Sequence, residues 1–139
     1  MFVDASAMVA VLAQEPGWEP FADVIDNAKA GTLITSVLAA WEAASGLSRI
    51  KRYTTAEAEE RVRRLLNVSG IELVGIGPDE LTLALQAFDR YGRHAYPQNQ
   101  RNLALNLADC FHYASAGSRG LPILHKDQGF AKTDIRSAL

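Results

Sequence analysis

The chain has 139 residues, 48% hydrophobic and 22% charged, which is typical of a globular protein near the common size of one domain. We therefore expect residues 1–139 to form a single domain. The formal net charge of -2 argues against a protein whose whole surface grips nucleic acid, because phosphate contacts usually demand many Lys and Arg. Cys110 is the single cysteine, which excludes an internal disulfide, and no Cys and His spacing resembles a zinc site, so we expect a cytoplasmic protein.

The N-terminus has no basic leader before an apolar stretch, and no apolar run approaches the roughly 18 residues that a membrane helix needs. We therefore expect a soluble protein that is not exported. Basic residues nevertheless gather in two groups, Arg49, Lys51 and Arg52 in the first and Arg90, Arg93, His94 and Arg101 in the second. Charge alone favours solvated helix surfaces for both groups, with a local basic rim as the alternative.

The first quarter of the chain begins with a short apolar strand at Phe2-Val3, which Asp4 ends. Ser6 is placed to cap a helix that ends near residues 15–17. A second helix is expected from about Trp18 to Lys29.

The middle of the chain repeats this alternation. The β-branched segment Thr32–Thr35 predicts a buried strand, and Ser36 is placed to cap a long helix toward Lys51. Thr54 and Glu57 form a capping-box pattern that opens the next helix. Ile71–Val74 is the third expected strand.

The last part of the chain continues the pattern. Pro78 opens an amphipathic helix whose apolar positions are Leu81, Ala84, Leu85, Phe88 and Tyr91. A further helix is expected over 103–116, a strand over 122–124, and a short last strand around Ile135. Strands that alternate with helices predict an α/β domain with a mainly parallel central sheet.

Two acidic residues lie where expected strands end. Ligands of open parallel sheets bind beyond the carboxyl ends of the strands, and Asp4 and Asp127 both follow apolar runs there. The competing interpretation is structural, because an aspartate after a strand also serves as a helix cap or a turn former.

Two further acids lie within otherwise apolar helices, where an ionised carboxylate is costly unless something compensates it. Glu42 is surrounded by small residues that would let its helix approach the sheet closely, although a surface glutamate is the alternative. Asp109 borders an expected core stripe formed by Leu103, Leu107, Cys110, Phe111 and Ala114. Asn106 and His112 share its face, which is either a site or a solvated edge, and we do not assign His112 to a metal.

Together these segments resemble a known family. The carrying residues are Asp4-Ala5-Ser6, Glu42, Leu107-Ala108-Asp109-Cys110-Phe111, Lys126-Asp127-Gln128-Gly129-Phe130 and Thr133-Asp134-Ile135. The chain resembles the PIN domain and, more narrowly, the VapC toxins. The resemblance implies a three-layer α/β/α sandwich, RNA cleavage, and a divalent-cation site made by Asp4, Glu42, Asp109 and a fourth acid.

The fourth acid is where this chain departs from many VapC-like sequences, which carry an aspartate immediately before the phenylalanine, where this chain has Gly129. Asp127 fits a second PIN pattern and follows the strand more closely than Asp134 does. We therefore choose Asp127 as the fourth acid and keep Asp134 as the alternative.

Four carboxylates in one cleft would repel one another unless a cation neutralised them. Oxygen-only ligands favour Mg²⁺ or Mn²⁺ over zinc, and we expect in-line attack by a metal-activated water on an RNA phosphodiester. Ser6 would be a hydrogen-bonding helper, since no partner base can be named for it. The chain would then be a metal-dependent endoribonuclease, the toxin of a toxin-antitoxin pair. The alternative function is a non-catalytic PIN-fold module that binds RNA or protein.

The resemblance also implies two protein interfaces, a homodimer and a groove for a VapB-type antitoxin. Apolar residues that the helical patterns do not easily bury are Trp18, Phe21, Val24, Trp41 and Leu47. Any that remain exposed would favour such interfaces, with core packing as the alternative.

Overall fold

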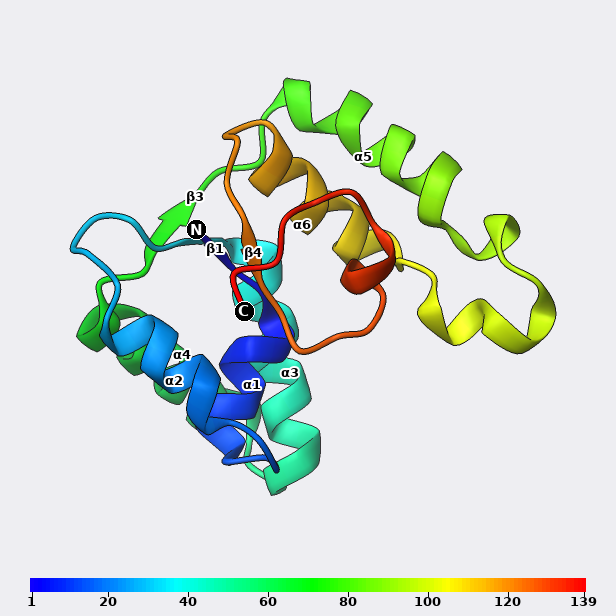
Figure 1. Cartoon of the computed structure of the whole chain (residues 1–139). Helices are drawn as coiled ribbons and strands as arrows, with labels where there is room; N and C mark the ends of the chain where they lie inside the picture. The colour runs from blue at the N-terminus through cyan, green and yellow to red at the C-terminus, as the bar shows by residue number, and fades with distance from the viewer.

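A computed structural model describes all of residues 1–139 and has a central sheet of four parallel strands (Figure 1). The strands are β1 (Phe2–Val3), β2 (Ile34–Ser36), β3 (Glu72–Val74) and β4 (Ile123–Leu124), and they lie in the order β3-β2-β1-β4. The expected parallel sheet is therefore confirmed. Phe2 pairs with Ile34 on one side and with Ile123 on the other, so β1 is a central strand.

Six α-helices and three short 3₁₀ helices connect and cover these strands. The α-helices are α1 (Ala5–Ala13), α2 (Glu19–Asp26), α3 (Val37–Lys51), α4 (Thr55–Ser69), α5 (Pro78–Tyr91) and α6 (Leu107–Gly117). The 3₁₀ helices are η1 (Arg93–Ala95), η2 (Gln98–Leu103) and η3 (Phe130–Lys132).

The strand order determines which face each helix covers. Right-handed connections from β1 to β2 and from β2 to β3 place α1 to α4 on one face, and the return connection from β3 to β4 places α5 and α6 on the other. Figure 1 shows α1 to α4 gathered together, with α5 and α6 packed against each other as a second group. These helices and the sheet form the three-layer α/β/α arrangement.

The hydrophobic core lies between the sheet and the helices that cover its two faces. Phe2, Val3, Ile123 and Leu124 are fully buried because the strands of a parallel sheet have helices on both faces. Ala39 and Ala43 of α3 are fully buried too, so this helix packs closely through its small residues, as expected.

Helix caps explain several boundaries. Ser36 and Thr54 cap α3 and α4 as predicted, and Thr54 forms the expected capping box with Glu57. The prediction for the first helix was wrong, since Asp4 rather than Ser6 is the N-cap of α1. An aspartate at this position accepts a hydrogen bond from the backbone of the first turn and so satisfies an otherwise unpaired donor.

The helix expected over 103–116 begins later, at Leu107, because Asn106 caps it and the preceding segment is the 3₁₀ helix η2. Leu107 is therefore 77% exposed and does not belong to the core stripe. No strand forms around Ile135, because a single bridge between Ile123 and Ser137 is the only ladder pairing there.

The apolar pattern of α5 marks its core face only in part. Ala84 is buried and Tyr91 is half-buried against the core, but Leu81, Leu85 and Phe88 are exposed. The polar residue Glu80 is buried instead. None of the helices combines the length and the apolar character needed to cross a membrane.

Candidate active site

The strand order places a ligand-binding crevice between β1 and β4. The chain passes from β1 to β2 on one side of β1, whereas β4, on the other side, is reached from β3 through α5 and α6. Such a reversal of strand order, beyond the carboxyl ends of parallel strands, is where α/β sheets bind ligands. A cleft of about 310 Å³ lies there. It is lined by Asp4, Ala5, Ser6, Val9, Glu15, Glu42, Asn106, Asp109, Lys126 and Asp127. The four acids chosen from the sequence thus lie around a single cleft.

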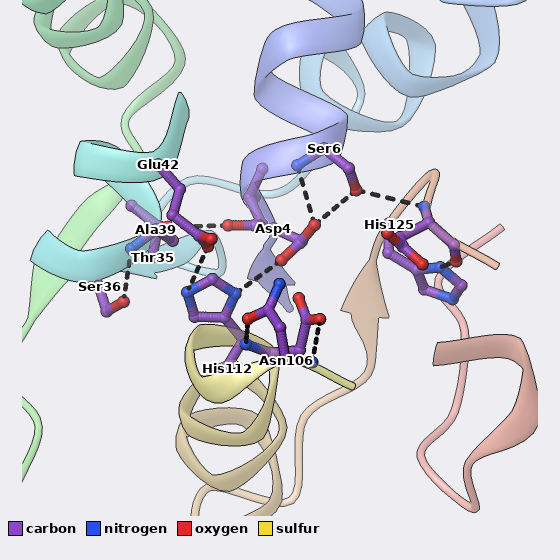
Figure 2. A network of polar contacts seen from close by, with 12 residues as sticks. Asp4, Ser6, Thr35, Ser36, Ala39, Glu42, Asn106, His112 and His125 are labelled. Atoms are coloured by element: carbon purple, nitrogen blue, oxygen red, sulfur yellow. Dashed lines mark hydrogen bonds and ion pairs between the residues drawn. The ribbon is translucent and has the colours of Figure 1, made fainter. Parts of the chain in front are cut away.

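Asp4 is held at the floor of this cleft at the end of β1, and only 3% of its surface is exposed (Figure 2). Its Oδ2 accepts hydrogen bonds from the backbone N–H of Ser6, at 2.9 Å, and from the Ser6 hydroxyl. Its Oδ1 lies 2.8 Å from Nδ1 of His112. Burial alone would raise the pKa of Asp4, but the contacts with His112 and Ser6 hold that pKa below its ordinary value.

Glu42 reaches the cleft from α3. Its Oε2 lies 3.5 Å from Nε2 of His112. Burial raises the pKa of Glu42; the charge of His112 opposes this rise, and the negative charges of Asp4 and Asp127 add to it. The nearby negative charges of Asp4 and Asp127 therefore favour the binding of a cation beside the Glu42 carboxylate.

Asp109 enters the cleft from the first turn of α6. It forms a capping box with Asn106: the backbone N–H of Asn106 donates to Asp109 Oδ2 at 2.8 Å, and the N–H of Asp109 donates to Asn106 Oδ1 at 3.0 Å. Burial raises the pKa of Asp109 to about 7, opposed by the hydrogen bond from Asn106 and reinforced by Asp4 and Asp127. Burial thus disfavours the ionised form of Asp109, and a cation bound beside it would stabilise that form.

His112 is the member of the site that the sequence did not assign. Its side chain is fully buried between Asp4 and Glu42 (Figure 2). Nε2 faces Glu42 at 3.5 Å but forms no hydrogen bond. Because an ionised carboxylate only accepts hydrogen bonds, Nδ1 carries the hydrogen that points to Asp4. The spacing of His112 and Asp109 on one helix face was visible in the sequence, but its burial against β1 was not.

Asp127 and Asp134 occupy different places. Asp127 lines the cleft, and its Oδ1 accepts a hydrogen bond from the N–H of Gly129 at 2.6 Å. Asp134 does not line the cleft; it accepts a hydrogen bond from the Tyr113 hydroxyl at 2.6 Å and lies 3.4 Å from Nη1 of Arg90.

The local packing is consistent with glycine at position 129. A Cβ on Gly129 would lie 3.1 Å from Asp127 Oδ1 and 3.3 Å from both the Leu103 carbonyl and Leu105 Cδ2. A side chain here would therefore crowd the acid that lines the cleft.

The loop after β4 is tied to the cleft by Ser6, whose Oγ accepts a hydrogen bond from the backbone N–H of Lys126 at 3.0 Å. The Lys126 ammonium is turned to the rim, where it pairs with Glu15 Oε2 at 2.8 Å. The only basic side chain that lines the cleft is thus already paired.

The donor set fits a hard divalent cation. Potential ligand atoms of Asp4, Asp109 and His112 lie within 4.8 Å of one another. His112 does not line the cleft, because its Nδ1 is committed to Asp4 and its Nε2 is buried beside Glu42. The ligands that face the cleft are therefore carboxylate oxygens, which Mg²⁺, Mn²⁺ and Ca²⁺ prefer.

Comparison with known families agrees with this fold and this cleft. The PIN domain model matches residues 1–136, and the chain belongs to the PIN-domain family.

Curated relatives define a narrower class. The chain is 35% identical to "VapC ribonuclease R02377" of Rhizobium meliloti, covering 96% of this chain and 98% of that protein. It is 31% identical to "Ribonuclease VapC42" of Mycobacterium tuberculosis, covering 99% and 98%. Within the PIN-domain family, the chain is therefore one of the VapC group.

A solved structure has the same fold. Mycobacterium tuberculosis VapC20, described as a Sarcin-Ricin loop cleaving toxin, superposes with a TM-score of 0.71 over 96% of this chain and 95% of its own. At 18% sequence identity, this likeness concerns the fold.

Proposed function

We propose that this chain is a divalent-metal-dependent endoribonuclease and the toxin of a toxin-antitoxin pair. The observation that carries the proposal is the meeting of Asp4, Glu42, Asp109 and Asp127 at one cleft, at the carboxyl ends of β1 and β4. These acids come from four separate segments, and mutual repulsion would disfavour their approach unless a cation were bound there. Relatives named as ribonucleases support RNA as the substrate.

The cation would be Mg²⁺ or Mn²⁺, held by Asp4 and Asp109, with Glu42 and Asp127 acting directly or through water. Magnesium usually keeps several waters and takes only one or two carboxylates, so four direct contacts are not required. When bound, the ion supplies an activated water and stabilises charge on the phosphorus oxygens.

The residues around the acids set their positions. Ser6 donates its hydroxyl hydrogen to Asp4 and accepts from the Lys126 backbone, so it joins β1 to the loop after β4. The carboxylate that accepts the Ser6 hydroxyl hydrogen is Asp4, whose pKa is held below its ordinary value, so it is too weak a base to make Ser6 a nucleophile, and Ser6 serves as a helper. The hydrogen bond with His112 orients Oδ1 of Asp4, while Oδ2 accepts the hydrogen bonds from Ser6.

The form of RNA attacked would be single-stranded or looped. RNA sequence is read mostly where bases are unstacked, and such segments let a backbone phosphate enter an open cleft. Such an RNA is met in the cytoplasm, where we expect the chain to act.

Two protein partners belong to this proposal, a second copy of the chain and a VapB-type antitoxin. Of the apolar residues that suggested interfaces, Phe21 and Leu47 are buried in the core, whereas Trp41 is 66% exposed. The exposed apolar side chains of α5 and the neighbouring residues of α6 line an apolar groove of about 750 Å³. Surfaces of this kind usually mark protein interfaces, and a basic antitoxin side chain would be drawn into the acidic cleft.

Digestion of total cellular RNA tests the ribonuclease directly. New RNA ends should appear with the purified chain and Mg²⁺, disappear with excess chelator, and return when Mg²⁺ is restored. Mapping of those ends identifies the RNA and the sequence cleaved. Ends that form equally in chelator would contradict a metal-dependent site.

A further inference from the structure

A second pocket opens beside the acidic cleft, in the segment formed by η1 and η2. It has a volume of about 490 Å³ and is lined by Arg93, Gln98, Arg101, Asn102, Ala104 and Asn106. Asn106 also lines the acidic cleft, so the two cavities meet at the N-cap of α6.

The chemistry of this pocket is opposite to that of the cleft. Every lining side chain except Ala104 carries hydrogen-bond donors, and no carboxylate lines the pocket. Arg93 and Arg101 are exposed and form neither an ion pair nor a side-chain hydrogen bond. Arg90 and Arg119 differ, because Arg90 pairs with Asp134 and Arg119 with Glu80.

An RNA strand that reaches the acidic cleft needs cationic groups nearby. The protein has a net charge of -2, and Lys126, the one basic residue of the cleft, is paired with Glu15. Arginine is the side chain best suited to phosphate, since its planar guanidinium donates two parallel hydrogen bonds to neighbouring oxygens.

We propose that Arg93 and Arg101 bind backbone phosphates of the RNA strand. These phosphates neighbour the phosphate that lies in the acidic cleft. This inference rests on the proposed ribonuclease function, whose substrate it positions. The amides of Gln98, Asn102 and Asn106 supply further hydrogen bonds to sugar hydroxyls or base edges.

Binding measured without cleavage tests this pocket. A fluorescein-labelled single-stranded RNA is titrated in chelator with the wild-type chain and with the double variant Arg93→Ala/Arg101→Ala, and anisotropy is recorded at several salt concentrations. The matched control is Arg49→Ala/Arg64→Ala, which removes two exposed arginines without an ion pair, one from α3 and one from α4, and neither of these arginines lines either cavity. Thermal melting checks that both variants are folded.

The pocket variant should bind at least about tenfold more weakly, and the slope of log K against log salt should become shallower by about 0.7 for each phosphate that the protein no longer neutralises. The control should bind as the wild type does. Equal binding by all three proteins, or equal weakening in both variants, would overturn the inference. Arg93→Lys with Arg101→Lys should recover part of the affinity, because the charge remains but the bidentate geometry does not.

The ribonuclease proposal is tested separately, by cleavage with Mg²⁺. If the wild type binds RNA through the two arginines but does not cleave it, the proposed activity fails while the pocket stands. If the wild type cleaves and the pocket variant binds RNA normally, the pocket fails while the activity stands.

Discussion

Nδ1 of His112 lies 2.8 Å from Oδ1 of Asp4, and both side chains are withdrawn from solvent. The hydrogen bond joins α6 to the end of β1 and fixes the direction of the carboxylate that lies deepest in the cleft. We expect His112→Phe, which keeps an aromatic ring but removes the donor, to weaken Mn²⁺ binding and cleavage by about 10–100-fold. Isothermal titration with Mn²⁺ measures the binding independently of activity.

The control for His112 is His112→Asn, whose amide nitrogen can replace Nδ1 as the donor to Asp4. It should recover part of the Mn²⁺ affinity even if it packs less well than phenylalanine. Equal Mn²⁺ affinity in the wild type and His112→Phe would show that Asp4 does not need this hydrogen bond.

The pKa of Asp109 leads to a pH prediction for the metal-free protein. Burial raises this pKa to about 7 in the folded chain, above the ordinary value for an aspartate, so the folded state binds a proton more tightly than the unfolded state. The protonated Asp109 contributes its full stability below the ordinary pKa of an aspartate, and this contribution is lost as pH rises through about 7.

Asp109→Asn should therefore raise the Tm of the metal-free protein at pH 8, because its amide oxygen can still accept from the Asn106 backbone without a buried charge. Mg²⁺ should raise the Tm of the wild type and leave that of the variant nearly unchanged. Melting curves with and without Mg²⁺ provide the measurement; a lower Tm for the metal-free variant at pH 8 would contradict the prediction.

The fourth acid can be tested by comparing Asp127 with Asp134. Asp127→Asn should reduce cleavage strongly because Asp127 lines the cleft. Asp134→Asn should leave cleavage nearly unchanged and cost less than about 1 kcal/mol of stability, since Asp134 and Arg90 form an exposed pair. Cleavage rates and urea melts of both variants separate the effects. A larger drop in activity at Asp134 would move the site to the later residue.

Glu80 supplies a stability prediction away from the cleft. It is buried, accepts a hydrogen bond from Arg119 Nη1 at 2.7 Å, and accepts another from the N–H of Gly77 at the start of α5. Burial would raise the pKa of Glu80, but the hydrogen bonds from Arg119 and Gly77 outweigh it and lower that pKa. The stability from Glu80 is therefore present above its unfolded pKa and is lost as pH falls through its folded pKa.

We expect Glu80→Ala to lower the free energy of unfolding by about 2 kcal/mol at pH 7, because both the ion pair with Arg119 and the hydrogen bond from Gly77 are lost. The destabilisation should shrink as pH falls below the unfolded pKa of a glutamate. Urea unfolding at pH 7 and near pH 4 measures it, and a destabilisation that stays constant over this range would show that the ion pair is not its source.

The sequence predicted much of the acidic cleft and several helix starts, because the signals for both lie within a few neighbouring residues. Asp4 and Asp127 follow apolar strands, and the ends of neighbouring parallel strands meet at one edge of the sheet. Ser36 and Thr54 have side chains that cap helices through the next few residues, so their role was visible without the fold.

The features that the sequence missed depend on which elements pack together. The burial of His112 comes from the packing of α6 against β1, and no spacing along α6 contains that information. Of the apolar residues named on α5, Ala84 is buried as its spacing suggested, but α6 packs against the face that carries Ala84 and Ala87 and leaves Leu85 exposed.

Cleavage of RNA by the wild type and by Asp4→Asn tests the metal site most directly. Each protein is stripped with chelator, dialysed and assayed on the same RNA while Mg²⁺ is added back, and circular dichroism verifies the fold. The wild type should regain cleavage as Mg²⁺ is restored, and Asp4→Asn should show none at any Mg²⁺ concentration. Near-normal cleavage by a correctly folded Asp4→Asn protein would contradict the assignment of the cleft as the catalytic metal site.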